Sequence, residues 1–161
     1  MKYLERLSVV LNLVFLTLGG ISVLALMCVA TGNVVLRILH IPFRGAYEIV
    51  SFLGAIVIAF SLGYTQQRKS HIVVDILTEK FPAGLARLLD TLSHFVTMVF
   101  FGVVSWQIYT WGMKIWESGE LSETLKIIYH PFIFAVSLGF ASLSLTALAQ
   151  FIADARGGEE K

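Results

Sequence analysis

The stretch LSVVLNLVFLTLGGISVLALMCVATGNVVL, residues Leu7–Leu36, contains no Asp, Glu, Lys or Arg. An α-helix rises 1.5 Å per residue, so about 20 such residues cross a hydrocarbon core of about 30 Å. Three more stretches of at least 19 residues share this property: Ile49–Gln67, Thr91–Met113 and Ile127–Ala153. Because lipid offers the backbone no hydrogen bonds, these stretches must form helices. We therefore predict an all-α membrane protein with four transmembrane helices.

Composition and charge exclude most soluble classes. Hydrophobic residues make up 57% of the chain and charged residues 14%, whereas about 25% of residues are charged in soluble domains. A soluble protein of this composition would expose large apolar patches and aggregate. The net charge of +1 gives no strong field for nucleic acid, so no nucleic-acid partner is expected. The single cysteine, Cys28, excludes an internal disulfide.

The positions of Lys and Arg indicate how the chain is oriented. If the N-terminus is cytoplasmic, eight of the 12 Lys and Arg residues lie on the cytoplasmic side and four on the other. Positively charged residues are enriched in cytoplasmic loops. We therefore expect both termini to be cytoplasmic.

Hydrophobic periodicity and prolines set the expected boundaries within a single membrane domain, 1–161. The helices are predicted over about 2–39, 46–67, 82–116 and 125–155, followed by a charged tail over 156–161. Between the second and third helices, apolar and polar residues fall on opposite sides of a helix over 71–81. This pattern is typical of a short amphipathic helix lying in the membrane interface.

Few residues in the spans could perform chemistry. An ion-coupled carrier needs ionisable groups or broken helices near mid-membrane, and none is evident here. A haem-binding membrane anchor would need two histidines at one iron, but His94 and His130 fall at opposite ends of their helices. A small multidrug exporter would need an embedded carboxylate, and Glu48 lies too near the outer surface. The sequence predicts neither an enzyme, nor a metal site, nor a cofactor.

Three polar segments occur in a recognisable order: Asn33–Arg37 closes the first helix, Gly45–Glu48 opens the second, and Gln67–Asp75 follows the second. In length, spans and this order, the chain resembles the small membrane subunit (DctQ type) of tripartite ATP-independent periplasmic (TRAP) transporters. The resemblance implies a multi-pass protein of the bacterial inner membrane. It also implies two protein partners, a large membrane subunit of the DctM type and a periplasmic substrate-binding protein.

In such a transporter the large subunit carries an organic acid, driven by sodium, and the binding protein delivers it. The resemblance implies that the small subunit is an accessory scaffold that braces the large one. The missing coupling residues agree with this role. The haem-binding anchor and the small exporter remain the alternatives.

Candidate residues for structural or interface roles are Asn33, Arg37, Glu48, His71 and Asp75. Arg37 and Glu48 flank one loop and are able to form an ion pair; the alternative for Arg37 is ordinary snorkelling to the interface. Arg68 and Lys69 are candidates for binding anionic lipid or for setting topology. The acidic residues of the last loop are candidates for contact with the binding protein or are simply solvated: Glu117, Glu120 and Glu123.

Overall fold

The computed structural model describes residues 2–41, 43–68 and 83–155. These residues form four α-helices: α1 (Lys2–Ile38), α2 (Ala46–Gln67), α4 (Ala83–Ser118) and α5 (His130–Ala155). Each helix contains a stretch long and apolar enough to cross a membrane. The prediction of an all-α protein with four membrane-spanning helices is therefore confirmed. The amphipathic helix expected over 71–81 and the tail over 156–161 lie outside the described residues.

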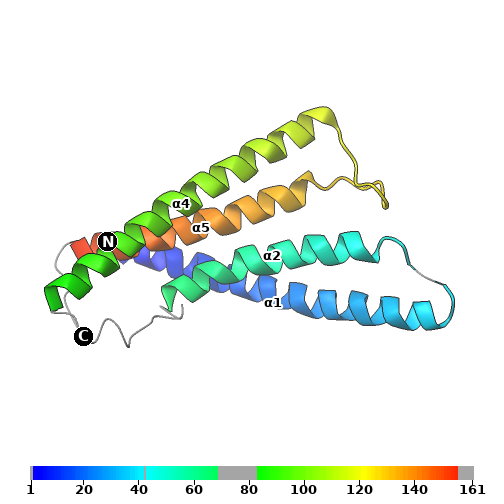
Figure 1. Cartoon of the computed structure of the whole chain (residues 1–161), viewed down its shortest axis with the longest axis horizontal. Helices are drawn as coiled ribbons and strands as arrows, with labels where there is room; N and C mark the ends of the chain where they lie inside the picture. Colours follow the sequence, from blue (N-terminus) through cyan, green and yellow to red (C-terminus); the bar gives the residue numbers. More distant parts are fainter. Residues whose placement is uncertain (1, 42, 69–82, 156–161) are drawn as a thin grey trace.

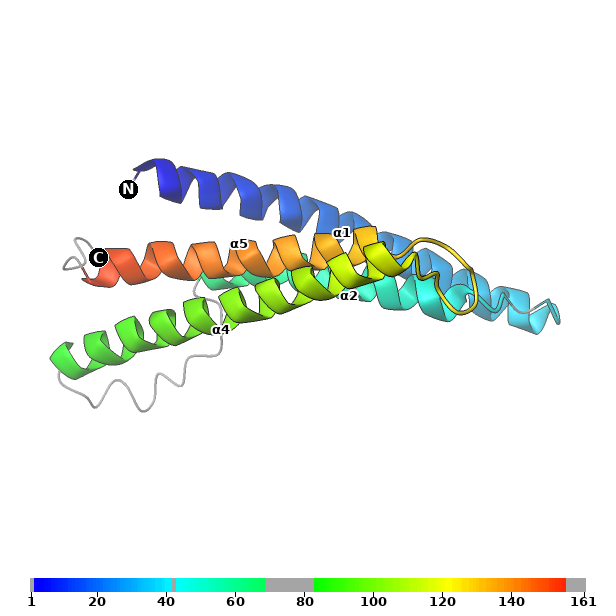
Figure 2. The same ribbon diagram turned by 90° about the horizontal axis from the view of Figure 1, so that it is seen from above.

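The helices form an open, layer-like arrangement in the order α1–α2–α5–α4, in which α1 also contacts α5. Helix α1 packs mainly against α2, α2 packs also against α5, and α4 packs mainly against α5. Figure 1 shows this order, and Figure 2, seen from above, shows α1 and α4 on opposite sides of the α2–α5 pair. Few residues of the membrane spans in α1 and α4 are buried, so these two helices leave much of their surface uncovered.

The two ends of the layer differ. We call the end with the connections 39–45 and 119–129 the loop end. The start of α1 and the end of α5 lie at the opposite end, which we call the terminal end (Figure 1). This arrangement follows from two antiparallel hairpins, α1–α2 and α4–α5.

Each neighbouring pair of helices contains one aromatic stack. Phe15 of α1 stacks on Phe60 of α2 with ring centroids 4.6 Å apart. The rings of Phe52 and Phe132 lie 5.0 Å apart between α2 and α5, and Phe101 of α4 stacks on Phe140 of α5 at 5.7 Å. Such pairs contribute about 0.5–1.5 kcal/mol beyond the burial of their surface. They help to hold the layer together across its width.

Serine hydroxyls join α4 to α5. The Oγ of Ser105 donates to the carbonyl oxygen of Ser137, and the Oγ of Ser137 donates to that of Ser105, both at 2.9 Å. Ser144 donates in the same way to the carbonyl of Met98 at 2.9 Å. Small polar residues let helix backbones approach closely in lipid and supply hydrogen bonds across the contact. This explains how α4 is held although it has little contact with α1 or α2.

The α2–α5 contact depends on Gly139. A Cβ atom at this position would lie 2.7 Å from the carbonyl oxygen of Ala59 and 2.8 Å from its Cβ. Because the obstacle is the backbone of another helix, no side-chain rotation would relieve it. At Gly20 on α1, by contrast, a Cβ atom would have no heavy atom within 4 Å.

Helix α1 ends in a Schellman motif. The N–H of Ile41 donates to Leu36 O at 2.9 Å and the N–H of His40 donates to Arg37 O at 3.1 Å. His40 adopts the left-handed conformation with φ 59°. The motif satisfies carbonyls that the helix end would leave without partners.

The last helix begins at His130, so the prediction of a start near Leu125 is wrong. Residues before it form an ordered loop with an antiparallel bridge between Leu121 and Ile128. Lys126 has a positive φ of 55°, which a helix does not accommodate. The helix starts only after Tyr129, whose carbonyl accepts from Phe132 N at 3.0 Å.

The glycine contacts predict opposite effects for two identical substitutions. Gly139→Ala is expected to lower the free energy of unfolding by about 1–3 kcal/mol, because α2 and α5 must separate to admit the methyl group. Gly20→Ala is expected to leave stability unchanged or raise it by up to about 1 kcal/mol, because alanine favours the helix. Unfolding of the purified protein by SDS in mixed micelles measures both; equal effects would contradict the close contact.

Candidate functional site

Asn12 is the centre of a buried polar cluster that joins three helices. Its Nδ2 donates to Gln67 Oε1 on α2 at 3.2 Å and to Thr146 Oγ1 on α5 at 3.0 Å. Its Oδ1 accepts from Ser142 Oγ on α5 at 2.9 Å. Asn12 is fully buried, so these bonds replace those that the amide would make with water. The cluster fixes the depth of α1 against α2 and α5.

Gly63 on α2 makes room for Asn12. A Cβ atom at residue 63 would lie 2.5 Å from Asn12 Oδ1. A larger residue would push α1 away and break the hydrogen bonds described above. The small residue and the amide therefore act together: the first permits close approach and the second fixes the register.

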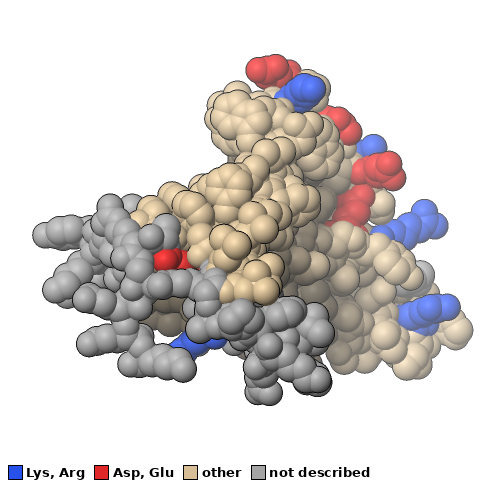
Figure 3. Space-filling model, turned by 60° about the vertical axis from the view of Figure 1, so that its left-hand side comes forward, with Lys and Arg blue, Asp and Glu red and all other residues tan. Residues whose placement is uncertain are grey.

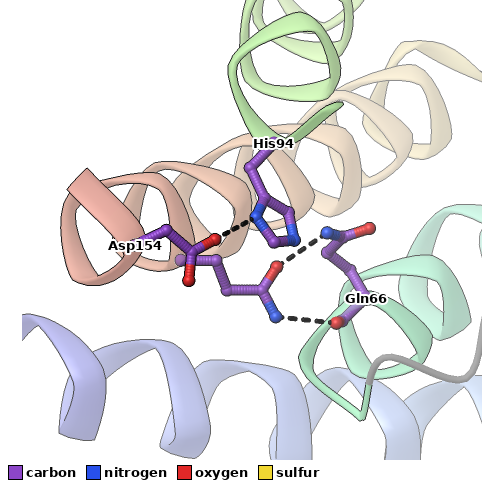
Figure 4. A network of polar contacts seen from close by, with 4 residues as sticks. Gln66, His94 and Asp154 are labelled. Carbon is purple, nitrogen blue, oxygen red and sulfur yellow. Dashed lines mark hydrogen bonds and ion pairs between the residues drawn. The ribbon is translucent and has the colours of Figure 1, made fainter. Parts of the chain in front are cut away.

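A second polar network lies at the terminal end and is shown in Figure 4. Gln66 Nε2 donates to Gln150 Oε1 at 2.7 Å, and Gln150 Nε2 donates back to the Gln66 carbonyl at 2.9 Å. One turn later on α5, Asp154 Oδ2 lies 2.7 Å from His94 Nδ1 on α4. Consecutive turns of α5 therefore bind α2 on one side and α4 on the other.

Glu48 attaches α2 to the α4–α5 connection at the loop end. Its carboxylate accepts the backbone N–H groups of Thr124 and Leu125, the second at 3.0 Å. Hydrogen bonds to an ionised acceptor are stronger than neutral ones. Of the two roles considered for Arg37, the ion pair with Glu48 is not formed, because the carboxylate is directed at the loop and Arg37 is exposed.

The three acidic residues expected in the last loop are exposed, but Glu117 belongs to the last turn of α4 and only Glu120 and Glu123 lie in the connection. Glu117, Glu120 and Glu123 all lie at the loop end, where Figure 3 shows charged side chains gathered beside a broad surface without charge. Partial burial, a hydrogen bond to Glu120 and the charges of Glu120 and Glu123 raise the pKa of Tyr129. Tyr129 therefore remains neutral and can donate to the acidic loop.

The other candidate residues have less defined surroundings. Asn33 is half-buried on α1 and its side chain makes no hydrogen bond with the described residues. Arg68 lies over the ring of Tyr64, 5.5 Å from its centroid, and its Nε donates to Tyr64 Oη at 3.1 Å. The remaining three, Lys69, His71 and Asp75, lie outside the described residues.

The described residues offer no site of metal or haem chemistry. No group of three or more His, Cys, Asp or Glu in residues 2–41, 43–68 and 83–155 could hold a metal ion. His94 is near the start of α4, at the terminal end, whereas His130 begins α5 at the loop end. Two histidines at opposite ends cannot bind one iron. The polar groups present hold helices together.

Substitution of Asn12 tests the central cluster. Asn12→Leu is expected to lower the free energy of unfolding by about 1–3 kcal/mol, because three hydrogen bonds are lost and their partners stay buried. Asn33→Leu on the same helix is the matched control and should change stability by less than about 0.5 kcal/mol. SDS titration in mixed micelles measures both. Equal losses would show that Asn12 has no special role.

Substitution of Glu48 tests the attachment of the loop. Glu48→Ala is expected to lower the temperature of unfolding and to speed hydrogen exchange at the amides of Thr124 and Leu125, because both lose their acceptor. Glu48→Gln keeps one acceptor oxygen and should have a smaller effect. Glu117→Ala, which removes an exposed carboxylate at the same end, should change neither quantity. Unaltered exchange in Glu48→Ala would refute the attachment.

Comparison with known proteins places this architecture in a family. The chain matches the family model described as "Tripartite ATP-independent periplasmic transporters, DctQ component" over residues 26–157. No curated protein and no solved structure is significantly similar to the chain. The match covers most of the chain, from the middle of α1 to beyond the end of α5, and a transporter component is not an enzyme. The chain therefore belongs to the DctQ family and is a small membrane subunit of a TRAP transporter.

Proposed function

We propose that this chain is the stationary brace of a sodium-driven TRAP transporter that imports organic acids across the bacterial inner membrane. In this proposal a large subunit of the DctM type carries the substrate and sodium, and a periplasmic binding protein delivers the substrate. The chain itself binds neither the substrate nor sodium. The observation that carries the proposal is the open packing of the helices, in which α1 and α4 leave most of their spans uncovered.

A layer of helices is poorly suited to transport by itself. A solute or ion crosses a membrane through a path that is shielded from lipid and lined by polar groups. The buried polar side chains here instead bond to one another across helix contacts, as Asn12 does with Thr146. The same layer presents wide apolar surfaces on its edge helices, including exposed Leu24 on α1 and Val103 on α4. Such surfaces suit contact with lipid and with a larger membrane protein.

We propose that both termini are cytoplasmic, which places the loop end in the periplasm. The distribution of Lys and Arg supports this orientation. Exposed Glu117, Glu120 and Glu123 would then face the periplasm and be accessible to the binding protein. Asn33 and Arg37 near the same end are proposed contacts with the large subunit, and so are His71 and Asp75, which lie outside the described residues. Arg68 and Lys69 would lie at the cytoplasmic surface, where anionic lipid is available.

Reconstitution tests the proposed division of labour. We expect a tag on this chain to co-purify a large polytopic subunit. Liposomes should take up substrate only when both membrane subunits, the binding protein and an inward sodium gradient are present. Liposomes with this chain alone should show no uptake above the protein-free level, because its helices enclose no path. Sodium-driven uptake by the chain alone would refute the proposal.

The brace also predicts a specific defect when the chain is omitted. The large subunit alone should be extracted in lower yield, and it should unfold at a lower temperature than the two-subunit complex, because binding stabilises a folded partner. Full activity and unchanged stability of the large subunit without this chain would show that bracing is not its role.

A further inference from the structure

A small hollow opens between α1, α2 and α5 near the terminal end. Its volume is about 190 Å³, and it is open to the outside rather than enclosed. A single water needs about 10–15 Å³ of such volume, so the hollow has room for a larger group. Its lining combines hydrogen-bonding side chains with small apolar ones: Ser8, Gln67, Thr146, Gln150, Ala149 and Ala153.

The hollow is lined by residues that lie near the ends of three candidate membrane spans. In the sequence, Ser8 closely follows the charged Arg6, Gln67 directly precedes Arg68, and Ala153 directly precedes Asp154. At this depth the hydrocarbon core meets the polar region of the bilayer. The lipid groups at this boundary are the glycerol backbone and the ester carbonyls of phospholipids.

The hydrogen-bonding groups of the hollow favour a neutral acceptor. None of the described residues that line it is charged, and phosphate is usually bound by Arg, Lys or backbone amides. Thr146 Oγ1 already donates to the Ser142 carbonyl and accepts from Asn12. Gln67 uses its Oε1 to accept from Asn12, whereas its Nε2 has no partner among the described residues. An amide N–H of this kind is a good donor to a carbonyl oxygen.

We propose that the hollow binds the glycerol–ester region of one membrane phospholipid. The Gln67 amide donates to an ester carbonyl, and Ala149 and Ala153 leave space for the glycerol. One acyl chain then continues past the exposed side chain of Val9 toward the middle of the bilayer. The bound lipid fills a depression into which the flexible acyl chains of the surrounding bilayer would pack poorly. This inference does not depend on the transporter role.

A comparison of lipids with ester and with ether linkages is the sharpest test, because the protein itself is left unaltered. The purified chain is exchanged into micelles containing equal amounts of diester phosphatidylcholine and a diether phosphatidylcholine with the same chains and headgroup. The diether lipid lacks the carbonyl acceptors. Native mass spectrometry should show the diester lipid retained about two- to tenfold over the diether, the range expected for one hydrogen bond. Equal retention would overturn the proposal.

Two variants locate the bound lipid. Ala149→Leu fills the hollow and should abolish the preference for the diester lipid. Ala141→Leu makes the same change at an exposed position of α5 outside the hollow and should leave the preference intact. Gln67→Glu keeps an acceptor for Asn12 but removes the amide donors, so it should reduce the preference to about one. Circular dichroism and size-exclusion chromatography check that each variant is folded.

Two further outcomes would contradict lipid binding in the hollow. If Ala149→Leu and Gln67→Glu both keep the wild-type preference for the diester lipid, the lipid binds elsewhere and the proposal fails. If Ala149→Leu instead blocks co-purification with a large subunit while lipid retention is unchanged, the hollow receives a protein side chain and the proposal is also wrong. A failure of the transporter role itself would leave the lipid preference of the isolated chain unaffected.

Discussion

The amide of Asn12 is the interaction on which the arrangement of α1, α2 and α5 depends. It lies in a membrane span, where a polar group without partners costs several kcal/mol. Thr146, Ser142 and Gln67 satisfy it from two other helices, and a sliding or rotation of α1 would break these bonds together. Apolar contacts alone would tolerate such sliding, because one lipid-like surface packs almost as well as another. The polar cluster therefore selects one register.

The second hairpin is attached by a different set of contacts. Helix α5 lies next to α2 and carries the partners of Gln66 and of His94 on successive turns. The Glu48 carboxylate makes the corresponding attachment at the loop end. The α2–α5 pair is thus held at both ends and by close backbone contact at Gly139. Helices α1 and α4 are added at the edges, which leaves their outer surfaces available for lipid or a partner.

The spans were predictable from sequence because the physical requirement is simple. About 20 uncharged residues in a lipid-facing stretch have to be helical, and the absence of Asp, Glu, Lys and Arg shows where they lie. The absence of charged residues does not reveal the polar clusters, because it takes no account of neutral amides such as Asn and Gln. Asn12 and Gln150 lie inside stretches that are defined only by the absence of charged residues. Asn and Gln side chains within a span could have predicted these clusters, because each amide needs a hydrogen-bond partner on another helix.

The partners of these groups could not have been predicted from local sequence. Glu48 and Thr124 are 76 positions apart, and the pairing of α2 with the last loop exists only once both hairpins are packed. The shortened start of α5 has the same origin: Thr124 and Leu125 donate to Glu48, and Lys126 takes a positive φ. Local pattern favours helix there, and a tertiary hydrogen bond overrides it.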